Sequence, residues 1–415
     1  MPSLPPTSSL PAATDTPTPR PPSRWLALDF LRVVAVTLMV EGHAFTALLG
    51  MPLRTAAWFQ RHTYVHGFTA PMFFFSSGLA FGVATFRKWH AHLVWGTAVK
   101  TRFARYAWLL FIGYLLHLPG LSLPRLWRSH SEAAWFEFTR VDALHHIAVV
   151  LAFLQLLVAL TRKKAIFVTL VAIFGALSVF SGPWAWRQPF NPDLPLWLSA
   201  YLNVHTGSIF PIVPWSGFIF VGVLIARWIC HGPDSTPDAR RGAWLLLPAV
   251  AALVFTHFVG QRGYELFGPH DFWKTSPIFF LTRVAYVQGL LSLLCLADLR
   301  SARAERSPAE QGRSPKGRLA ERFALGLRVI GQQTLVIYIV HLLLLYGFPA
   351  FSGFNVRWGR SLSLGASILA FLVLMAASVA VAFGWNRLKT GNYPWFDKAR
   401  YATAAAIVVF ALLNG

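Results

Sequence analysis

Residues 25–43 read WLALDFLRVVAVTLMVEGH, an apolar stretch that nevertheless contains Asp29, Arg32, Glu41 and His43. A run of roughly 17–25 mostly apolar residues is long enough to cross a bilayer as a helix. Ionisable side chains inside a membrane are costly and usually functional. The stretch therefore predicts a membrane protein with a functional site in its first helix.

Similar apolar runs recur along the chain, and the composition agrees with a bilayer as its surroundings. Hydrophobic residues make up 55% of the 415 residues and charged residues 13%, against about 25% charged residues in a typical soluble domain. The predicted fold class is all-α, a polytopic membrane helix bundle with about 10–11 transmembrane helices. The expected spans are 25–49, 68–86, 104–123, 143–160, 165–185, 209–228, 243–259, 277–297, 329–348, 362–385 and a short run at 401–413 that would either span or lie flat.

The remaining segments are polar and differ in character. Residues 1–24 are rich in proline and are predicted to form a disordered cytoplasmic tail. Residues 25–415 are expected to form the membrane domain. Within it, residues 300–328 are rich in Arg, Ser, Pro and Gly and are predicted to be a mobile basic cytoplasmic loop.

The net charge of +21 follows the predicted loops. With the N-terminus in the cytoplasm, 25 of the 37 Lys and Arg residues fall in cytoplasmic segments, as the positive-inside rule requires. The charges therefore indicate orientation, and no nucleic-acid partner is expected. The protein is predicted to be an integral membrane protein, in the cytoplasmic membrane if the source is bacterial. Only two cysteines are present, Cys230 and Cys295, which excludes a disulfide scaffold.

Arg32 and His43 are the first candidate pair. They are eleven residues apart, about three helical turns, so both project from one face and lie roughly 16 Å apart along the axis. Asp29 precedes Arg32 by three residues and can pair with it. Glu41 points to the opposite side, and Arg283 is its suggested partner.

Further candidates lie toward the outer side, where eleven of the fourteen histidines fall. Asp142, His145 and His146 begin a predicted helix at spacings that let the carboxylate orient an imidazole. We expect Asp142 and His145 to be catalytic. The expected substrate-binding residues are His146, Trp215, His341 and Arg283. His62 and His66 are four residues apart and would share a helical face. A metal site that combines them with this cluster is conceivable, but the preferred interpretation includes no metal.

Three further expectations concern packing and access. Pro211 and Pro214 in the stretch FPIVPW are expected to break the start of the helix that carries Trp215. Gly78 and Gly82 are expected to permit close helix packing. Arg32 and His43 are expected to line one passage through the bundle.

This layout suits acyl transfer across a membrane. The phosphates of a cytoplasmic acyl-CoA would meet Arg32 or basic loop residues. The thioester would reach His43, which would take a proton from an extracytoplasmic hydroxyl or amine, or would carry the acyl group itself. The expected partners are the lipid bilayer, acetyl-CoA or another acyl-CoA as donor, and an extracytoplasmic glycan or amino sugar.

Several stretches resemble known membrane acyltransferases. The Arg-x10-His spacing from Arg32 to His43 resembles the signature of the acyltransferase-three family. The collinear stretches HGFTAPMFFFSSGLAFG (66–82), RVDALHHIAVVL (140–151), GSIFPIVPWSGFIFVGVLIA (207–226) and IGQQTLVIYIVHLLLLYG (330–347) are more similar to the heparan-alpha-glucosaminide N-acetyltransferase catalytic-domain family.

The resemblance implies an O- or N-acetyltransferase that uses acyl-CoA. It implies that Arg32, with Asp29 beside it, binds the acyl donor and that His43 is catalytic. In the heparan branch the active histidine follows the first helix, so His66 is a second catalytic candidate. A proton-coupled secondary transporter and a non-enzymatic scaffold are the competing functions. Acetyl or longer acyl transfer, and a monomer or homodimer, both stay open.

Overall fold

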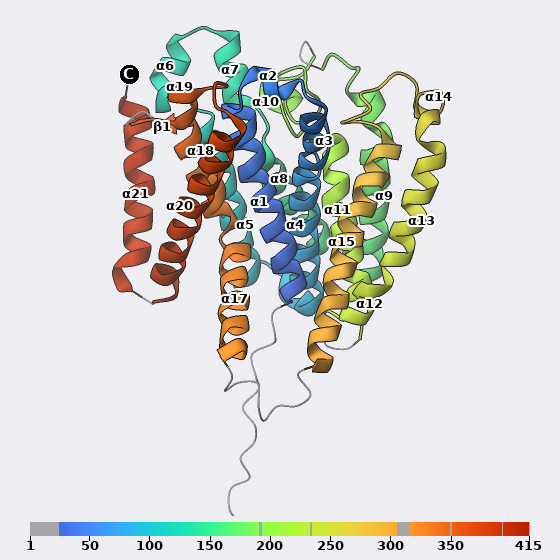
Figure 1. The fold of residues 1–415 in the computed structure, drawn as a ribbon. Helices are drawn as coiled ribbons and strands as arrows, with labels where there is room; N and C mark the ends of the chain where they lie inside the picture. The colour runs from blue at the N-terminus through green and yellow to red at the C-terminus, as the bar shows by residue number, and fades with distance from the viewer. Residues whose placement is uncertain are drawn as a thin grey trace, which may run out of the picture.

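The computed structural model describes residues 25–190, 193–232, 235–304, 315–348, 351–391 and 393–414. The tail predicted at 1–24 lies outside the described residues. The described part is almost entirely helical (Figure 1), as predicted. The long helices are α1 (Leu26–Leu48), α3 (Ala57–His66), α4 (Thr69–Arg87), α5 (Thr97–Leu116), α8 (Ala143–Thr161), α9 (Lys164–Ala185), α11 (Ile212–Ile229), α13 (Leu246–Val259), α15 (Pro277–Ala304), α17 (Pro315–Gln332), α18 (Thr334–Tyr346), α20 (Leu364–Thr390) and α21 (Pro394–Leu413).

Short elements connect the long helices at the two ends of the bundle. They are the helices α2 (Met51–Arg54), α6 (Leu123–Arg128), α7 (Glu132–Thr139), α10 (Leu196–Ser199), α12 (Ala239–Trp244), α14 (Gly263–Phe267) and α19 (Phe354–Trp358), the 3-10 turns at Trp89–His92, Pro119–Leu121 and Gly260–Arg262, and the strands β1 (Gly347–Phe348) and β2 (Phe351–Ser352). We call the end where α1 begins the lower end and the end where α1 finishes the upper end, as drawn in Figure 1.

Eight segments of the described chain are long and apolar enough to cross a membrane. A ninth results if α17 and α18, bent by 70° at Gln333, count as one broken span. Every predicted run contains a helix. Helices α5 and α21 are not among the eight apolar segments, because each carries three charged residues near its lower end, at 100–105 and 397–400. These charges place those ends at a polar interface, and the protein is an integral membrane protein.

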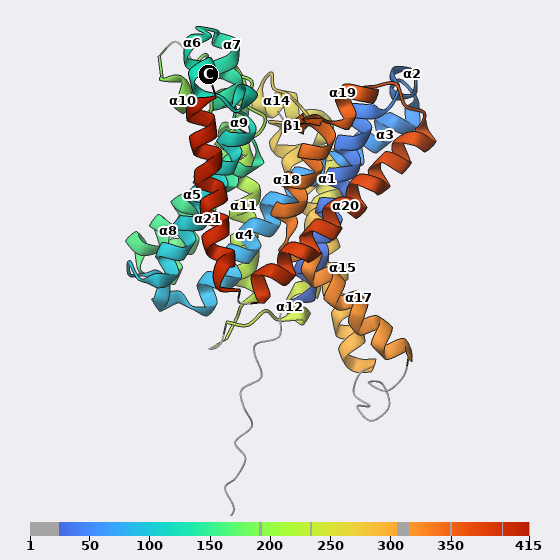
Figure 2. The ribbon, with the colours of Figure 1, turned by 90° about the vertical axis from the view of Figure 1, so that its left-hand side faces the viewer.

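Helix α1 is central and contributes to two apolar cores. Its first half packs with α4 and α15 through residues such as Leu31 and Ala35. Its second half packs with α18 and α20 through residues such as Val40 and Leu48. Figure 2 shows α20 and α18 beside α1, whereas α21 stands apart from α1 and contacts α6. The ionisable residues of α1 therefore lie at the junction of two packed groups of helices.

The predicted close packing at Gly78 and Gly82 is confirmed for the α4–α11 pair. A Cβ on Gly78 would lie 1.9 Å from the backbone oxygen of Ile219, and a Cβ on Gly222 would lie 2.2 Å from that of Phe75. Only glycine permits this approach, in which the two backbones almost touch. The contact holds α4, and with it the chain from α3, against α11.

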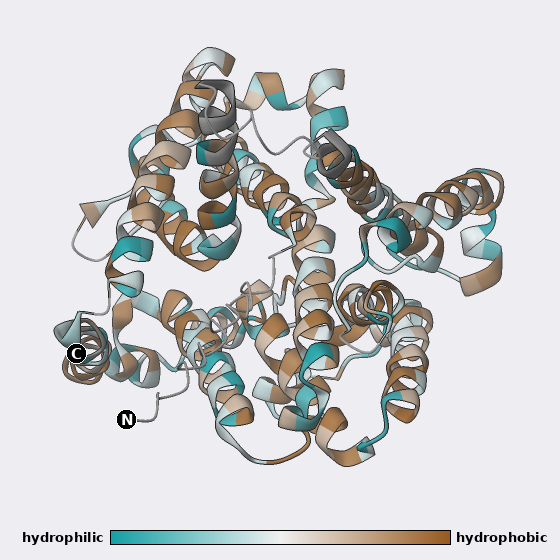
Figure 3. Ribbon diagram, turned by 90° about the horizontal axis from the view of Figure 1, so that it is seen from below, coloured by the Kyte–Doolittle hydropathy of each residue, from teal (hydrophilic) through white to brown (hydrophobic). Residues whose placement is uncertain are grey.

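The outward faces of the helices are apolar, as expected for helices in lipid. Exposed side chains include Leu160, Phe180, Phe258 and Leu369, and Figure 3 shows hydrophobic segments around the whole ring of helices. Residues 300–328 are more helical than the predicted loop, because α15 continues to Ala304 and α17 begins at Pro315. The part of that loop at 305–314 lies outside the described residues.

Candidate functional site

The upper half of α1 brings His43 against His341 of α18. Nδ1 of His43 lies 2.9 Å from Nε2 of His341, and the two rings stack with centroids 5.1 Å apart. Nδ1 of His341 lies 2.8 Å from the backbone oxygen of Ile337, one turn earlier in α18. His341 is fully buried, while His43 is partly exposed. Two histidines 298 residues apart thus form one hydrogen-bonded chain.

The backbone carbonyl of Ile337 fixes the direction of both hydrogen bonds. A backbone carbonyl only accepts, so Nδ1 of His341 carries the proton and, in the neutral ring, its Nε2 is an acceptor. Nδ1–H of His43 then donates to that nitrogen. Nε2 of His43 keeps its lone pair, and no described residue hydrogen-bonds to it. A neutral imidazole held in this tautomer is a general base.

His66 lies next to this pair, at the end of α3. Its ring is 6.5 Å from that of His43 and 6.3 Å from that of His62. A Cβ on Gly42 would lie 1.7 Å from Nε2 of His66, so the imidazole edge occupies the space that this glycine leaves open. Because Nε2 of His66 faces a helix backbone and is buried without a hydrogen-bond partner, it is less available to a substrate than Nε2 of His43.

Glu41 has a different partner from the one suggested by the sequence. Its Oε1 lies 2.5 Å from Nε2 of His62, and the suggested pairing with Arg283 is wrong. The reason is that α3 folds back along α1 and presents His62 on the side to which Glu41 points. His62 and His66 do share a helical face, as their spacing predicted.

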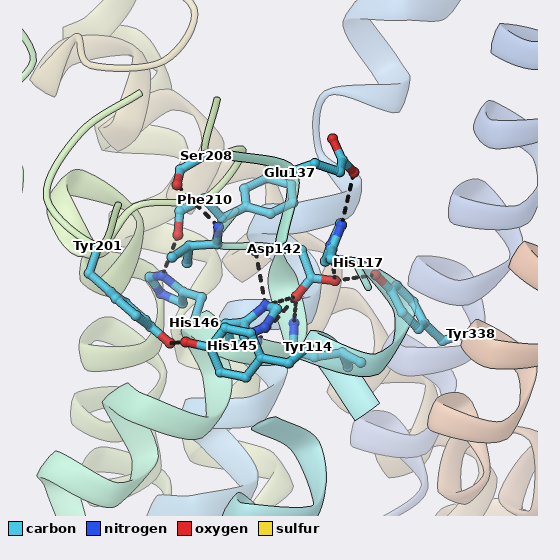
Figure 4. Close-up of polar contacts among 12 residues, drawn as sticks. Tyr114, His117, Glu137, Asp142, His145, His146, Tyr201, Ser208, Phe210 and Tyr338 are labelled. Carbon is cyan, nitrogen blue, oxygen red and sulfur yellow. Dashed lines mark hydrogen bonds and ion pairs between the residues drawn. The ribbon is translucent and has the colours of Figure 1, made fainter. Parts of the chain in front are cut away.

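The second cluster is centred on Asp142, the N-cap of α8 (Figure 4). One carboxylate oxygen accepts from the backbone N–H groups of Leu144 and His145 and lies 2.7 Å from Nδ1 of His145. The other oxygen accepts from the Tyr338 hydroxyl at 3.1 Å and lies 3.4 Å from Nε2 of His117. The sequence spacing correctly predicted that Asp142 orients an imidazole, and the contact forms a capping box.

The electrostatics of this cluster favour an ion pair. Burial alone would lower the pKa of His117, but hydrogen bonds with Asp142 and Glu137 raise it to about 9. Burial alone would raise the pKa of Asp142, but hydrogen bonds from His117 and His145 hold it well below its usual range. Glu137 also pairs with Arg140. At neutral pH the cluster therefore contains a carboxylate and an imidazolium.

The same three residues, His117, Asp142 and His145, are the group in the described chain that could hold a metal ion, since their ligand atoms lie within 4.8 Å of one another. Their nitrogen and oxygen donors suit zinc. However, both carboxylate oxygens already serve the helix cap and the imidazolium. The hydrogen bonds therefore account for the cluster without an added ion.

A cavity of 2660 Å³ joins the two clusters. His43, His66, His117, Asp142 and Tyr338 all line it. It also reaches residues near the α20–α21 turn at the lower end, namely Trp385, Leu388, Trp395 and Phe396. A pocket for one small molecule usually has about 300–1,000 Å³. The cavity is therefore large enough for two substrates at once.

Two of the predicted substrate-binding residues line the cavity together. The Arg283 guanidinium lies 5.7 Å from the ring of Trp215 and 4.2 Å from that of Phe279. Trp215 follows the predicted break at the start of α11, where Val213 departs from helical geometry and its carbonyl accepts from the Trp186 indole at 2.7 Å. The broken turn thus directs Trp215 into the cavity.

The other predicted residues lie away from the cavity. His145, His146 and His341 are fully buried and do not line it. His146 packs on Phe74 and its Nδ1–H donates to the carbonyl of Phe210 at 3.0 Å. The prediction that His146 and His341 contact the substrate directly does not fit these positions. Helices α4 and α11 cover His146, and His43 covers His341.

Arg32 and Asp29 lie lower on α1 and do not line the cavity either. Asp29 is buried where α1 meets α17, close to Gly331. The expectation that Arg32 and His43 border one common passage is therefore not met. The predicted pairing of Asp29 with Arg32 stays a prediction.

Comparison with known proteins identifies the chain at the family level. A family model described as an acyltransferase domain matches residues 25–386, from the start of α1 almost to the end of α20. The chain belongs to the acyltransferase-3 family. Membership in the acyltransferase-3 family agrees with one of the two resemblances drawn from the sequence, and the likeness to the heparan acetyltransferase branch is not confirmed. No protein of curated function matches the chain at a significant level.

The acyltransferase-3 match includes both histidine clusters, but not α21, which adds one wall of the cavity. The sequence analysis did not single out Tyr338 or His117 as site residues. Tyr338 could have been found from its position three residues before His341, which puts both on one face of α18. His117 carried no such signal, because its partner Asp142 is 25 residues away and the contact depends on how α5 and α8 pack.

Proposed function

We propose that this membrane acyltransferase transfers an acetyl or other acyl group from acyl-CoA to a sugar hydroxyl or amine. His43 is the general base. The observation that carries the proposal is the unpartnered Nε2 of His43 at the wall of a cavity with room for two substrates. Nε2 of His341 accepts the hydrogen bond from Nδ1–H of His43 and so holds the His43 ring in one orientation.

The proposed reaction has two proton movements. Nε2 of His43 takes the proton of the acceptor hydroxyl or amine while the acceptor attacks the thioester carbonyl. The new carbon–oxygen or carbon–nitrogen bond forms, the carbon–sulfur bond breaks, and the CoA thiolate takes the proton back from the imidazolium. The His341 contact supports the positive charge of the intermediate imidazolium, because its Nε2 faces the Nδ1–H of His43. These steps restore neutral His43 without any further reactant.

The donor is proposed to enter from the lower end, which is cytoplasmic in the predicted topology. Two features support this direction. Most basic loops lie at that end, and the cavity extends toward it past Trp385 and Trp395. Arg32, with Asp29 beside it, lies outside the cavity and is the proposed contact for the part of the CoA moiety that stays outside the cavity. The acceptor would enter from the extracytoplasmic side, near His43.

The test measures labelled acetyl transfer by the purified full-length protein in liposomes. The readout is release of free CoA together with the label on an added sugar, for wild type, His43→Ala and Arg32→Ala. We expect His43→Ala to retain acetyl-CoA binding and lose turnover, and Arg32→Ala to raise the KM for acetyl-CoA. Full activity in both variants would overturn the assignment. Proton-coupled sugar uptake without CoA release would instead identify a carrier.

A further inference from the structure

The charge along the cavity wall is unbalanced. Among the residues that the structure describes, six Lys and Arg side chains line the cavity, namely Arg54, Arg61, Arg140, Lys274, Arg283 and Arg400. The carboxylates that line it are those of Glu137 and Asp142, and both already have partners in the Asp142 cluster. An excess of cations in a confined space attracts and holds anions.

Arg283 is the most constrained of these cations. Only 7% of its surface is exposed. Its Nε is buried without a hydrogen-bond partner, and within the described chain Arg283 forms no ion pair or hydrogen bond. The nearby carboxylate of Asp271 accepts instead from the backbone N–H groups of Trp273 and Lys274. A buried guanidinium with unsatisfied donors is costly unless an anion or water in the cavity satisfies it.

The guanidinium is also close to the proposed chemistry. A Cβ on Gly67 would lie 3.6 Å from its Nη2, and Gly67 directly follows His66. Arg283 is six residues into α15 from Pro277, in the upper part of the bundle, where His43 and His66 also lie. This is the end from which the acceptor enters in the proposed function, opposite the end assigned to the donor.

Aromatic side chains form the wall around Arg283. Trp215 and Phe279 face the guanidinium, and Trp273 lies 5.2 Å from Phe279 and 6.0 Å from Tyr64 between ring centroids. Tyr64, Trp215 and Trp273 line the cavity. Aromatic walls with one fixed charged group are typical of sites that bind an organic ligand in a single orientation.

We propose that Arg283 is a binding subsite for a negatively charged group, a carboxylate or a phosphate, of the acyl acceptor. The planar guanidinium binds such groups through paired hydrogen bonds. The proposal rests on the proposed function in that it assigns this part of the cavity to the acceptor. It makes the acceptor an anionic molecule, whereas acyl transfer alone requires only a hydroxyl or an amine.

The experiment measures equilibrium binding without an acyl donor, so its outcome does not depend on whether transfer occurs. The probes are methyl β-D-glucuronide, its neutral counterpart methyl β-D-glucoside, and glucose 6-phosphate. Each is measured with the full-length protein in detergent. The variants are Arg283→Gln and Arg283→Lys. Arg187→Gln is the matched control, because Arg187 is exposed at the same end and does not line the cavity.

We expect wild type and Arg187→Gln to bind at least one anionic probe about tenfold more tightly than the glucoside. Arg283→Gln should lose this difference, and Arg283→Lys, which keeps the charge, should retain part of it. The tighter of the two anionic probes identifies a carboxylate or a phosphate as the favoured group. Equal binding of charged and neutral probes by wild type, no binding of either anionic probe, or an unchanged preference in Arg283→Gln overturns the proposal.

Discussion

The two histidine clusters differ in where their unpartnered nitrogen lies. In the Asp142 cluster both carboxylate oxygens of Asp142 have hydrogen-bond partners and the residue caps α8, while the unpartnered Nε2 of His145 is buried away from the cavity. In the His43 cluster the hydrogen bonds start at a backbone carbonyl and lead to Nε2 of His43, which has no hydrogen-bond partner among the described residues and belongs to a residue that lines the cavity. A buried, hydrogen-bonded carboxylate stabilises a fold, whereas an oriented base that faces a cavity is available for chemistry.

This difference separates two regions that look alike in the sequence. Both contain closely spaced carboxylates and imidazoles near the upper ends of helices, and both were assigned catalytic residues. The structure favours different roles for the two clusters. His43 would act on the substrate, whereas Asp142 holds α5, α8 and α18 together through His117 and Tyr338.

The largest expected effect tests the catalytic role of His43. His43→Ala should lower kcat about 1,000-fold, because the general base is lost, and should change the melting temperature little. The measurement is labelled acetyl transfer together with thermal unfolding in detergent. His205→Ala is the matched control, since His205 is exposed and outside the cavity. A His43→Ala variant that loses stability and activity together would erase the distinction between the clusters.

The next effect tests the structural role of the Asp142 cluster. Asp142→Ala should lower the free energy of unfolding by about 3 kcal/mol, because it removes a helix cap and the more buried of the two carboxylates that pair with the His117 charge. Asp238→Ala removes the exposed N-cap of α12, which has no histidine partner, and should cost only about 1 kcal/mol. Thermal or denaturant unfolding of both variants measures the difference. Equal losses would mean that Asp142 is only a cap.

A smaller effect tests whether His341 positions His43. His341→Leu removes the acceptor for the Nδ1 proton and should lower kcat about 30-fold. His341→Gln offers an amide oxygen and should recover most of this loss. The pH dependence of kcat distinguishes positioning from packing, because loss of the acceptor should change the apparent pKa of the base. Identical pH profiles in wild type and His341→Leu would leave His341 as packing alone.

The smallest effect concerns pH. The pKa of His117 is about 9 in the folded protein and near 6.5 in the unfolded chain. A raised folded-state pKa adds stability that is complete below pH 6.5 and is lost as the pH rises through 9. Between pH 7 and 10 wild type should therefore lose about 1–2 kcal/mol more than His117→Gln. Parallel pH curves for the two proteins would contradict the ion pair with Asp142.

Much of the fold could be predicted from local patterns. Runs of apolar residues have to be helical in lipid, because each backbone polar group needs a partner within its own segment. The helical segments were therefore found almost completely, including the break before Trp215. The errors lie where local composition misleads: α17 continues through a basic stretch that was predicted to be a loop, and α3 had no apolar run to mark it.

The candidate site was only partly predictable. Spacing within one helix correctly paired Asp142 with His145 and put His62 and His66 on one face. Partners on different helices could not be found in this way. His43 meets His341 and Glu41 meets His62 only because α18 and α3 pack beside α1.

The sequence by itself determined that the chain is a helical membrane protein and that its first helix carries ionisable residues, since hydropathy and helical period are local properties. Tertiary structure alone decided which histidine has an available nitrogen. Burial, hydrogen-bond saturation and access to the cavity depend on contacts between segments far apart in the chain, and those contacts separate His43 from the other histidines.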